Sequence, residues 1–228
     1  MTTVSHLTIA FALFLGCGDS SGTAGAGAIG GQGGAGGGGA GGTAGQNTGG
    51  APQGGDGGAG STGGAGGAPT LGGRVFVTSA TYDGVLGGIA GADQRCQMHA
   101  DAAGLGGTFR AWLSDTQGNG PLTTFAQSAE PYELVGGDEI AANWADLIDG
   151  SIATPINRDE TGTPVGDVTP VAWTGTQASG MPGSPCCDDW SSTASGAWHG
   201  STMAIDAMWS FQSGLGCTSV ARLYCFEQ

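Results

Sequence analysis

Proton transfer and nucleophilic attack need a base, and histidine is the side chain best suited to that role near neutral pH. The chain has three histidines, His6, His99 and His199. His199 is followed by Ser201 and Asp206, so the residue types of a Ser–His–Asp triad occur close together. Their spacing matches no known nucleophile elbow, and we interpret the grouping as a chance occurrence. The spacing of His99 predicts a helix position beside the core. A surface hydrolase is therefore the weakest of three functional hypotheses for this chain.

Cysteine offers a second kind of chemistry. Cys186 and Cys187 are adjacent, whereas zinc-binding pairs usually have two residues between them, so no zinc site is predicted. In an exported protein the cysteines are expected to form disulfides instead. If Cys17 carries a lipid, four of the remaining cysteines could form two bridges and one is left over. The six cysteines of the chain are Cys17, Cys96, Cys186, Cys187, Cys217 and Cys225.

Two carboxylates directly follow the paired cysteines. Asp188 and Asp189 lie in a predicted loop, where carboxylates and backbone carbonyls together could hold Ca²⁺. The simpler interpretation is that both are solvated loop acids. We therefore predict no cofactor, with calcium at Asp188 and Asp189 as the alternative.

The first residues of the chain predict export. An apolar run covers residues 7–15, which is too short to span a bilayer as a helix, since a spanning helix needs about 20 residues. It suits the apolar region of a signal peptide, although the preceding residues contain no Lys or Arg. The run ends in Leu15-Gly16-Cys17, which resembles a bacterial lipobox. Residues 1–17 are thus predicted to be a signal peptide, with Cys17 lipidated as the mature N-terminus.

Composition divides the rest of the chain into two parts. Residues 18–72 consist almost entirely of small residues in repeats of the GGAGG type, and the chain as a whole contains 50 glycines. Such a segment buries too little apolar surface to offset its chain entropy, so we predict a disordered linker with a span of roughly 40 Å. Residues 73–228 have ordinary globular composition and a common domain size. One domain on a Gly/Ala-rich tether is the predicted organisation.

The charge of the chain excludes several classes of partner. Nineteen acidic residues against five basic ones give a net charge of −14. The basic residues are scattered, so no basic stripe is available to bind phosphates. Nucleic acids, heparin-like polyanions and anionic membrane surfaces are therefore not expected as partners, and contact with a membrane is predicted only through the lipid anchor. All five basic residues are arginines: Arg74, Arg95, Arg110, Arg158 and Arg222.

Hydrophobic periodicity in the domain predicts an α+β fold. Alternation predicts strands over 74–78, 108–113, 132–135 and 220–226. A one-sided apolar pattern predicts a helix over 92–103, which ends at Gly104. A second helix is predicted over 138–148, because Ile140, Trp144, Leu147 and Ile148 share one helical face. After residue 150 we expect short strands and long loops.

Several segments are similar to a known domain, and they occur in the same order. Residues 88–114 (GIAGADQRCQMHADAAGLGGTFRAWLS) resemble the first helix and following strand of endostatin, the C-terminal module of collagens XV and XVIII. Residues 74–93 are also similar to a related bacterial family of surface lipoproteins of unknown function. The resemblance covers nearly all of residues 74–228. Its other segments are residues 143–150 (NWADLIDG), 171–175 (VAWTG), 187–190 (CDDW) and 216–228 (GCTSVARLYCFEQ).

The resemblance implies a C-type-lectin-like (endostatin-like) fold. It also implies two nested disulfides, Cys96–Cys225 and Cys187–Cys217, with Cys186 as an alternative to its neighbour. Three features of the relatives are missing from the sequence: the basic heparin-binding surface, the N-terminal histidine cluster and the carbohydrate- and calcium-binding motifs of true C-type lectins. The fold is therefore expected to carry over, whereas these ligands are not.

Aromatic side chains on loops are the candidates for contact with a ligand. Trp198 and Trp209 fall where endostatin-like chains have no fixed aromatic residue, and His199 is next to the first of them. Together with the anchor and tether, they favour a non-enzymatic binding or adhesion module at the outer membrane surface, facing the periplasm or the exterior. Its partner would be a protein or glycan of the cell surface. The alternative is a structural envelope protein that assembles through its domain.

Overall fold

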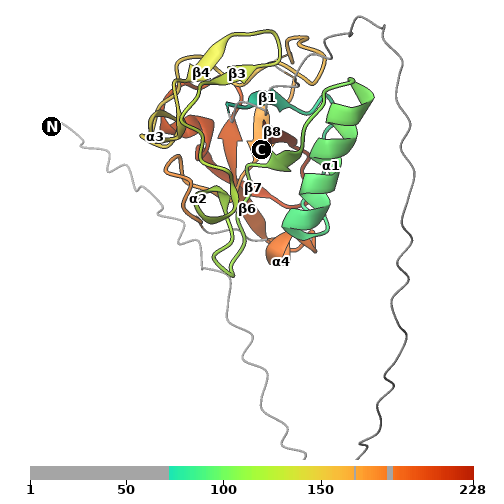
Figure 1. The fold of residues 1–228 in the computed structure, drawn as a ribbon. Coiled ribbons are helices and arrows are strands. Elements are labelled where there is room, and N and C mark those ends of the chain that lie inside the picture. Colours follow the sequence, from blue (N-terminus) through green and yellow to red (C-terminus); the bar gives the residue numbers. More distant parts are fainter. Residues whose placement is uncertain (1–71, 167, 184–186) are drawn as a thin grey trace, which may run out of the picture. The chain divides into compact units, whose positions relative to one another are not determined.

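The C-terminal strand forms the centre of the sheet in the computed structural model (Figure 1), which describes residues 72–166, 168–183 and 187–228. Strand β8 (Arg222–Glu227) pairs antiparallel with β1 (Arg74–Val77) along one edge. Its other edge is shared by β5 (Val171–Trp173), which is parallel, and β2 (Phe109–Ala111), which is antiparallel. The two ends of the domain are thus hydrogen-bonded to each other in its middle.

The remaining strands extend the sheet on both sides. Its order is β4-β3-β1-β8-β5-β6-β7, with β2 paired to β8 outside this path. Helix α1 (Gly88–Ala102) is the one long helix among the described residues, and it lies beside the sheet (Figure 1). The domain is therefore α+β, as the sequence predicted. The other elements are α2 (Pro121–Thr124), β3 (Tyr132–Leu134), β4 (Glu139–Ala141), α3 (Trp144–Leu147), α4 (Cys187–Trp190), β6 (Gly196–Ser201), η1 (Ala207–Trp209) and β7 (Ser213–Gly216).

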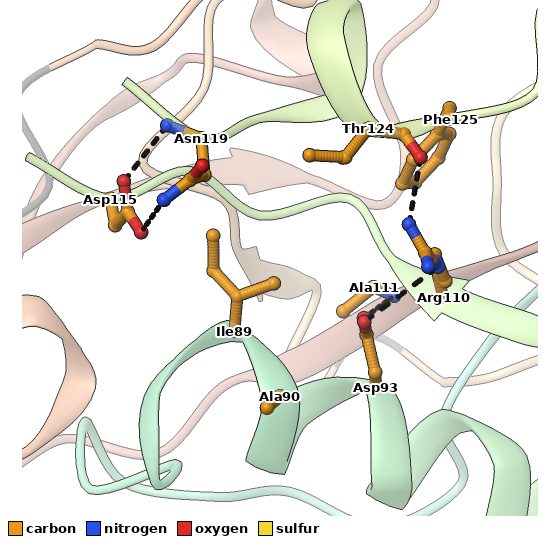
Figure 2. A pocket seen from close by; sticks show the side chains of 9 residues that line it. All are labelled: Ile89, Ala90, Asp93, Arg110, Ala111, Asp115, Asn119, Thr124 and Phe125. Carbon is orange, nitrogen blue, oxygen red and sulfur yellow. Dashed lines mark hydrogen bonds and ion pairs between the residues drawn. The ribbon is translucent and has the colours of Figure 1, made fainter. Parts of the chain in front are cut away.

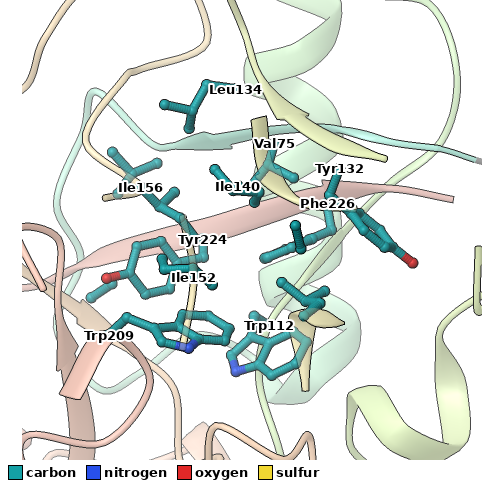
Figure 3. Packing of buried hydrophobic residues seen from close by; sticks show 14 of the residues in the cluster. Val75, Trp112, Tyr132, Leu134, Ile140, Ile152, Ile156, Trp209, Tyr224 and Phe226 are labelled. Carbon is teal, nitrogen blue, oxygen red and sulfur yellow. The ribbon is translucent and has the colours of Figure 1, made fainter. Parts of the chain in front are cut away.

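The central strands are buried on both faces, and this divides the core in two. Successive side chains of a strand point to opposite faces, so Val75 and Val77 enter one cluster and Phe76 enters the other. Tyr224 and Phe226 likewise join the first cluster. That cluster is rich in aromatic rings, with the centroids of Trp112 and Phe226 5.3 Å apart (Figure 3). The second cluster contains both disulfides and the buried face of α1.

Helix α1 packs closely on the sheet because its buried side chains are small. Ala92, Cys96 and Ala100 recur at intervals of four and are fully buried. The helix begins at Gly88, four residues before the predicted start, after Gly87 with φ +82°. Cys96 is bonded to Cys225 of β8, which ties the helix to the central strand. The side chains on the two flanks of this buried stripe face different neighbours, and each flank carries polar residues.

The predicted helix over 138–148 is wrong in its first half. Gly136 and Gly137 have φ +124° and +95°, which turns the chain back so that Glu139–Ala141 forms β4 against β3. Helical structure is confined to Trp144–Leu147, capped by the Asn143 side chain, which accepts from the Asp146 amide. The residues of the apolar stripe are all buried or partly buried in the first cluster, but they reach it from a strand and a single helical turn. The helical spacing of these buried residues therefore does not mean that they lie on one helix.

A left-handed turn holds the second disulfide. Cys187, Asp188, Asp189 and Trp190 have φ values of 55°, 51°, 50° and 66°. Each such non-glycine residue costs roughly 1–2 kcal/mol, so the turn needs support from its surroundings. The Cys187–Cys217 disulfide supplies one anchor, and the buried Trp190 supplies another because its indole N–H donates to the Ser114 carbonyl. Both disulfides are the pairs that the resemblance implies, and Cys186 lies outside the described residues.

The export segment was predicted for a part of the chain that the structure does not describe. Residues 1–17 with Cys17, and the predicted linker up to residue 71, lie outside the described residues. Within the described ranges, α1 and the shorter helices do not have the length and apolar character needed to cross a bilayer. The anchor and the tether stay predictions from the sequence.

Candidate functional site

A chain of short hydrogen bonds connects Tyr82, His99 and Glu160 on one side of α1. The Tyr82 hydroxyl lies 2.7 Å from His99 Nε2, and His99 Nδ1 lies 2.7 Å from Glu160 Oε1. Ser79 closes the other end, because its backbone N–H and its hydroxyl both donate to the Glu160 carboxylate. The His99 and Glu160 side chains are only 12% and 8% exposed. His99 lies beside the core, as the sequence predicted, but its carboxylate partner comes from a loop 61 residues away.

The serine of this hydrogen-bonded network is not placed as a triad nucleophile, because its hydroxyl bonds to Glu160 and not to His99. The histidine does lie between a hydroxyl and a carboxylate, but that hydroxyl belongs to Tyr82. Tyr82 is the one hydroxyl bonded to the histidine among the described residues. Desolvation raises the pKa of Tyr82, which disfavours its ionised form despite the Arg95 guanidinium 4.4 Å from its ring centroid. The arrangement joins the loop at Glu160 to α1 and to the end of β1.

A hollow of about 260 Å³ opens on the other side of α1 (Figure 2). We call it the α1 pocket. Its walls are the first turns of α1, strand β2, residues 115–119 and the end of α2. Figure 2 shows Ile89 between two polar pairs, Asp93 with Arg110 and Asp115 with Asn119. The pocket therefore has an apolar middle and a polar group at each end.

The Asp93–Arg110 pair uses only part of its hydrogen-bonding capacity within the protein. One N–H of Arg110 donates to the Thr124 carbonyl at 2.7 Å, and its Nε lies 4.0 Å from Asp93 Oδ2. That separation is too long for a hydrogen bond, and the guanidinium makes no further hydrogen bond to the described residues. Asp93 Oδ1 accepts from the Ala111 amide at 2.9 Å, which fixes the carboxylate on β2. Desolvation raises the pKa of Asp93, although the Ala111 bond and the Arg110 charge oppose it.

The second polar pair is organised by its own loop. Asp115 Oδ1 accepts from the Gln117 and Asn119 amides at 2.9 Å, and its Oδ2 accepts from the Asn119 side-chain amide at 2.7 Å. The left-handed turn supports this loop from outside. Asp189 accepts from the Thr116 amide at 2.9 Å and from its hydroxyl at 2.7 Å. The wall of the pocket is thus fixed by the same turn that the Cys187–Cys217 disulfide holds.

This geometry equips the α1 pocket for binding. Charged and amide groups converge on it with unused donors and acceptors, and its frame is fixed by backbone pairing and by the Cys96–Cys225 bridge. The sequence prediction missed Asp93, Arg110, Asp115 and Asn119 as site residues. Two signals were available: Arg110 takes a polar position in an otherwise apolar strand, and Asp115 and Asn119 bracket a turn. Neither signal shows that the residues share a pocket.

The three predicted contact residues have different environments. Trp209 is fully buried, with its ring centroid 4.8 Å from that of Trp112, so it has no exposed surface with which to contact a ligand, contrary to the prediction. The tertiary contacts of the first core cluster, which bring η1 onto β8, bury it. His199 is 6% exposed, and burial lowers its pKa. Trp198 is partly exposed and stacks on Phe211 at 3.9 Å between centroids. These three residues lie on β6 and η1, and neither element lines the α1 pocket.

The residue types of the apparent triad serve local structure instead. Asp206 Oδ1 accepts from the Met208 amide at 3.0 Å, and Ser201 Oγ accepts from the Met203 amide at 3.3 Å. Within the described part of the chain, His199 Nδ1 has no hydrogen-bond partner. The structure therefore does not connect the three side chains.

The two calcium candidates face different partners. Both oxygens of Asp189 accept from Thr116, and Asp188 Oδ2 lies 3.3 Å from the Ser191 hydroxyl. Among residues 72–166, 168–183 and 187–228, no group of three or more His, Cys, Asp or Glu side chains is placed to hold a metal ion. Asp189 has a structural role in supporting the pocket loop.

Comparisons with known proteins do not place the chain in a family. No protein-family model matches it, and no curated protein matches it significantly. The resemblance to endostatin-like domains stays a prediction based on the segments described above.

Proposed function

We propose that this chain is a non-enzymatic binding module held at the bacterial outer membrane surface by a lipid on Cys17. The observation that carries the proposal is the α1 pocket, where Asp93, Arg110 and Asn119 present unused hydrogen-bonding groups on a disulfide-linked frame. Binding sites of this kind combine an apolar surface with a few placed polar groups. In this proposal the Gly/Ala-rich linker carries the domain away from the membrane.

The proposal includes a C-type-lectin-like fold for residues 73–228. Two features support it: the nested disulfides Cys96–Cys225 and Cys187–Cys217, and the pairing of the first and last strands at the centre of the sheet. A fold of this class tolerates long loops because covalent bridges and central strands fix its frame. Recognition would then depend on loop residues such as those at 115–119.

Binding is favoured over catalysis by the lining of the pocket. The described lining residues include no histidine or cysteine, and Thr124 is the one hydroxyl side chain among them. A serine or cysteine nucleophile paired with a histidine base is not among these residues. The histidine–carboxylate pair lies on the other side of α1, where it is bonded to Tyr82 and Ser79.

A pocket-filling variant tests the binding function. Ala90 lines the pocket on an exposed face of α1, so Ala90→Trp should fill the space with little loss of stability. We expect saturation-transfer NMR on the intact chain to detect binding in a panel of amino acids, hexoses, hexosamines, dicarboxylates and polyamines. The signal should disappear in Ala90→Trp.

Ala102→Trp, at an exposed position at the far end of the same helix, is the matched control and should keep the signal. If no class of compound receives saturation, or if Ala90→Trp binds as well as the unmodified chain, the pocket is not a binding site. That result would favour a structural envelope protein.

The lipid anchor has its own test. When the full chain is expressed in a bacterial host supplied with an alkyne fatty acid, we expect the label on Cys17 and partitioning into the detergent phase. Cys17→Ser should abolish both, because its hydroxyl does not replace the thiol that receives the lipid. Ser20→Ala is the control and should behave as the unmodified chain does. An unlabelled chain that stays in the aqueous phase would refute the anchor.

A further inference from the structure

The size of the α1 pocket restricts its ligand. Its volume of about 260 Å³ falls below the range of roughly 300–1,000 Å³ that is usual for drug-sized ligands. This space takes one small molecule, or one terminal group of a larger ligand. The ligand must also satisfy charges of both signs, because the lining contains Asp93, Asp115 and Arg110.

The Asp93–Arg110 pair complements two opposite charges on adjacent atoms. Asp93 Oδ2 and Arg110 Nε are 4.0 Å apart and do not form a hydrogen bond, so the pair is weak and open to a competitor. The Arg110 fork matches the two oxygens of a carboxylate. Asp93 is partly desolvated, so an ammonium group beside it would stabilise its ionised form. The head group of an α-amino acid carries a carboxylate and an ammonium on one carbon.

The other end of the pocket favours hydrogen-bond donors. Ile89 lies between the two polar pairs (Figure 2), so the side chain of a ligand held at Asp93 and Arg110 would extend over Ile89 towards Asp115 and Asn119. Asp115 is a carboxylate, and the Asn119 side-chain carbonyl accepts no hydrogen bond from the described residues. A ligand carboxylate would be repelled by Asp115, whereas an amide or ammonium group would donate to this pair.

We propose that the α1 pocket binds a free α-amino acid whose side chain carries a hydrogen-bond donor. The ligand carboxylate pairs with Arg110, its α-ammonium pairs with Asp93, and its side chain donates at Asp115 and Asn119. This inference rests on the proposed binding function and names the ligand class for the same pocket. A neutral sugar has no charged group to pair with Asp93 or Arg110. A dicarboxylate would place a negative charge beside Asp93 or Asp115, which would repel it.

Isothermal titration of the intact chain tests each contact with matched probes. L-Glutamine and L-glutamate have nearly the same shape, so their comparison isolates the donor requirement. N-Acetyl-L-glutamine lacks the ammonium charge, and L-glutaminamide lacks the carboxylate. We expect glutamine to bind at least tenfold more tightly than each of the other three.

Two substitutions test the assignment of the head group. Arg110→Gln keeps a donor for the Thr124 carbonyl but removes the charge, and Asp93→Asn keeps an acceptor for the Ala111 amide. Each should weaken glutamine binding at least tenfold. Arg158→Gln and Asp138→Asn change the same residue types at positions outside the pocket, and they should bind as the unmodified chain does.

The outcomes separate this inference from the proposed function. Equal binding of glutamine and its derivatives would overturn the inference, as would full affinity in both Arg110→Gln and Asp93→Asn. If hexoses or polyamines bind in the NMR panel and amino acids do not, the binding function stands and the amino-acid ligand is wrong. If no class binds, both fail.

Discussion

Replacing Cys96 and Cys225 together with alanine is expected to lower the free energy of unfolding by about 5 kcal/mol. The bridge joins residues separated by 129 positions, so its removal restores the conformational entropy of a long loop to the unfolded chain. Both side chains are fully buried between α1 and β8, and alanine keeps their β-carbons. Equilibrium unfolding in denaturant, with circular dichroism as the signal, measures the loss.

The second bridge provides the comparison. Cys187→Ala with Cys217→Ala opens a loop of only 30 positions, for which the same chain-entropy relation gives about 4 kcal/mol. The pair at 96 and 225 should therefore be the more damaging of the two. If that variant proves too unstable to purify while the 187–217 variant folds, the ranking is the same. A larger loss from the 187–217 pair would contradict the loop-length argument.

Glu160→Gln is expected to lower the free energy of unfolding by about 3 kcal/mol at pH 7. Both Glu160 oxygens accept hydrogen bonds, from His99 and from the hydroxyl and amide of Ser79. Glutamine removes the negative charge and replaces one acceptor oxygen with an NH₂ group, so the charge-assisted hydrogen bonds are lost and the Ser79 hydroxyl and the His99 ring must reverse their donor roles to pair with that group. Glu133→Gln, at an exposed position on β3, is the control and should change stability little.

The effect of Glu160→Gln should depend on pH. Desolvation acts to raise the pKa of Glu160, but the hydrogen bonds from Ser79 and His99 outweigh it and hold the pKa below its usual value. A carboxyl group whose pKa is lowered by folding stabilises the protein above its unfolded pKa, and this contribution is lost as the pH falls through the folded pKa. The difference between the unmodified chain and the variant should therefore shrink below about pH 4.5.

Unfolding curves at several pH values between 7 and 2 measure this change. Ser79→Ala removes only the hydroxyl donation, so a smaller loss in the same direction is expected from it. That variant keeps the test available if Glu160→Gln does not fold. A stability difference that stays constant over the whole pH range would show that Glu160 contributes by packing and not by its charge.

Strong local patterns determined the central elements. The alternation of β1 and β8 and the small-residue stripe of α1 are visible in the sequence, and each follows from the geometry of one segment. The α+β class follows from these elements. The two disulfide pairs required the resemblance, because counting cysteines leaves several pairings open.

Contacts between distant segments decided the rest. Ile140 and Trp144 have helical spacing, yet Gly136 and Gly137 turn the chain so that β4 pairs with β3, and one residue lies in a strand and the other in a short helix. The residues next to Trp209 in the sequence do not indicate that it is buried, and the aromatic cluster around β8 covers it. A single segment fixes its own backbone preferences but not the surface that another segment presents to it.

The same limit applies to the sites. The sequence contains Asp93, Arg110 and Asn119 as three unrelated polar positions, and packing of α1 against β2 and the 115–119 loop gathers them into a pocket. His99 meets Glu160 only after a separation of 61 residues is closed by folding. The sequence by itself determined β1, β8 and α1, and it predicts the domain limits and the export. The tertiary structure decided which side chains meet, because hydrogen bonding and burial depend on distances in space that periodicity along the chain does not encode.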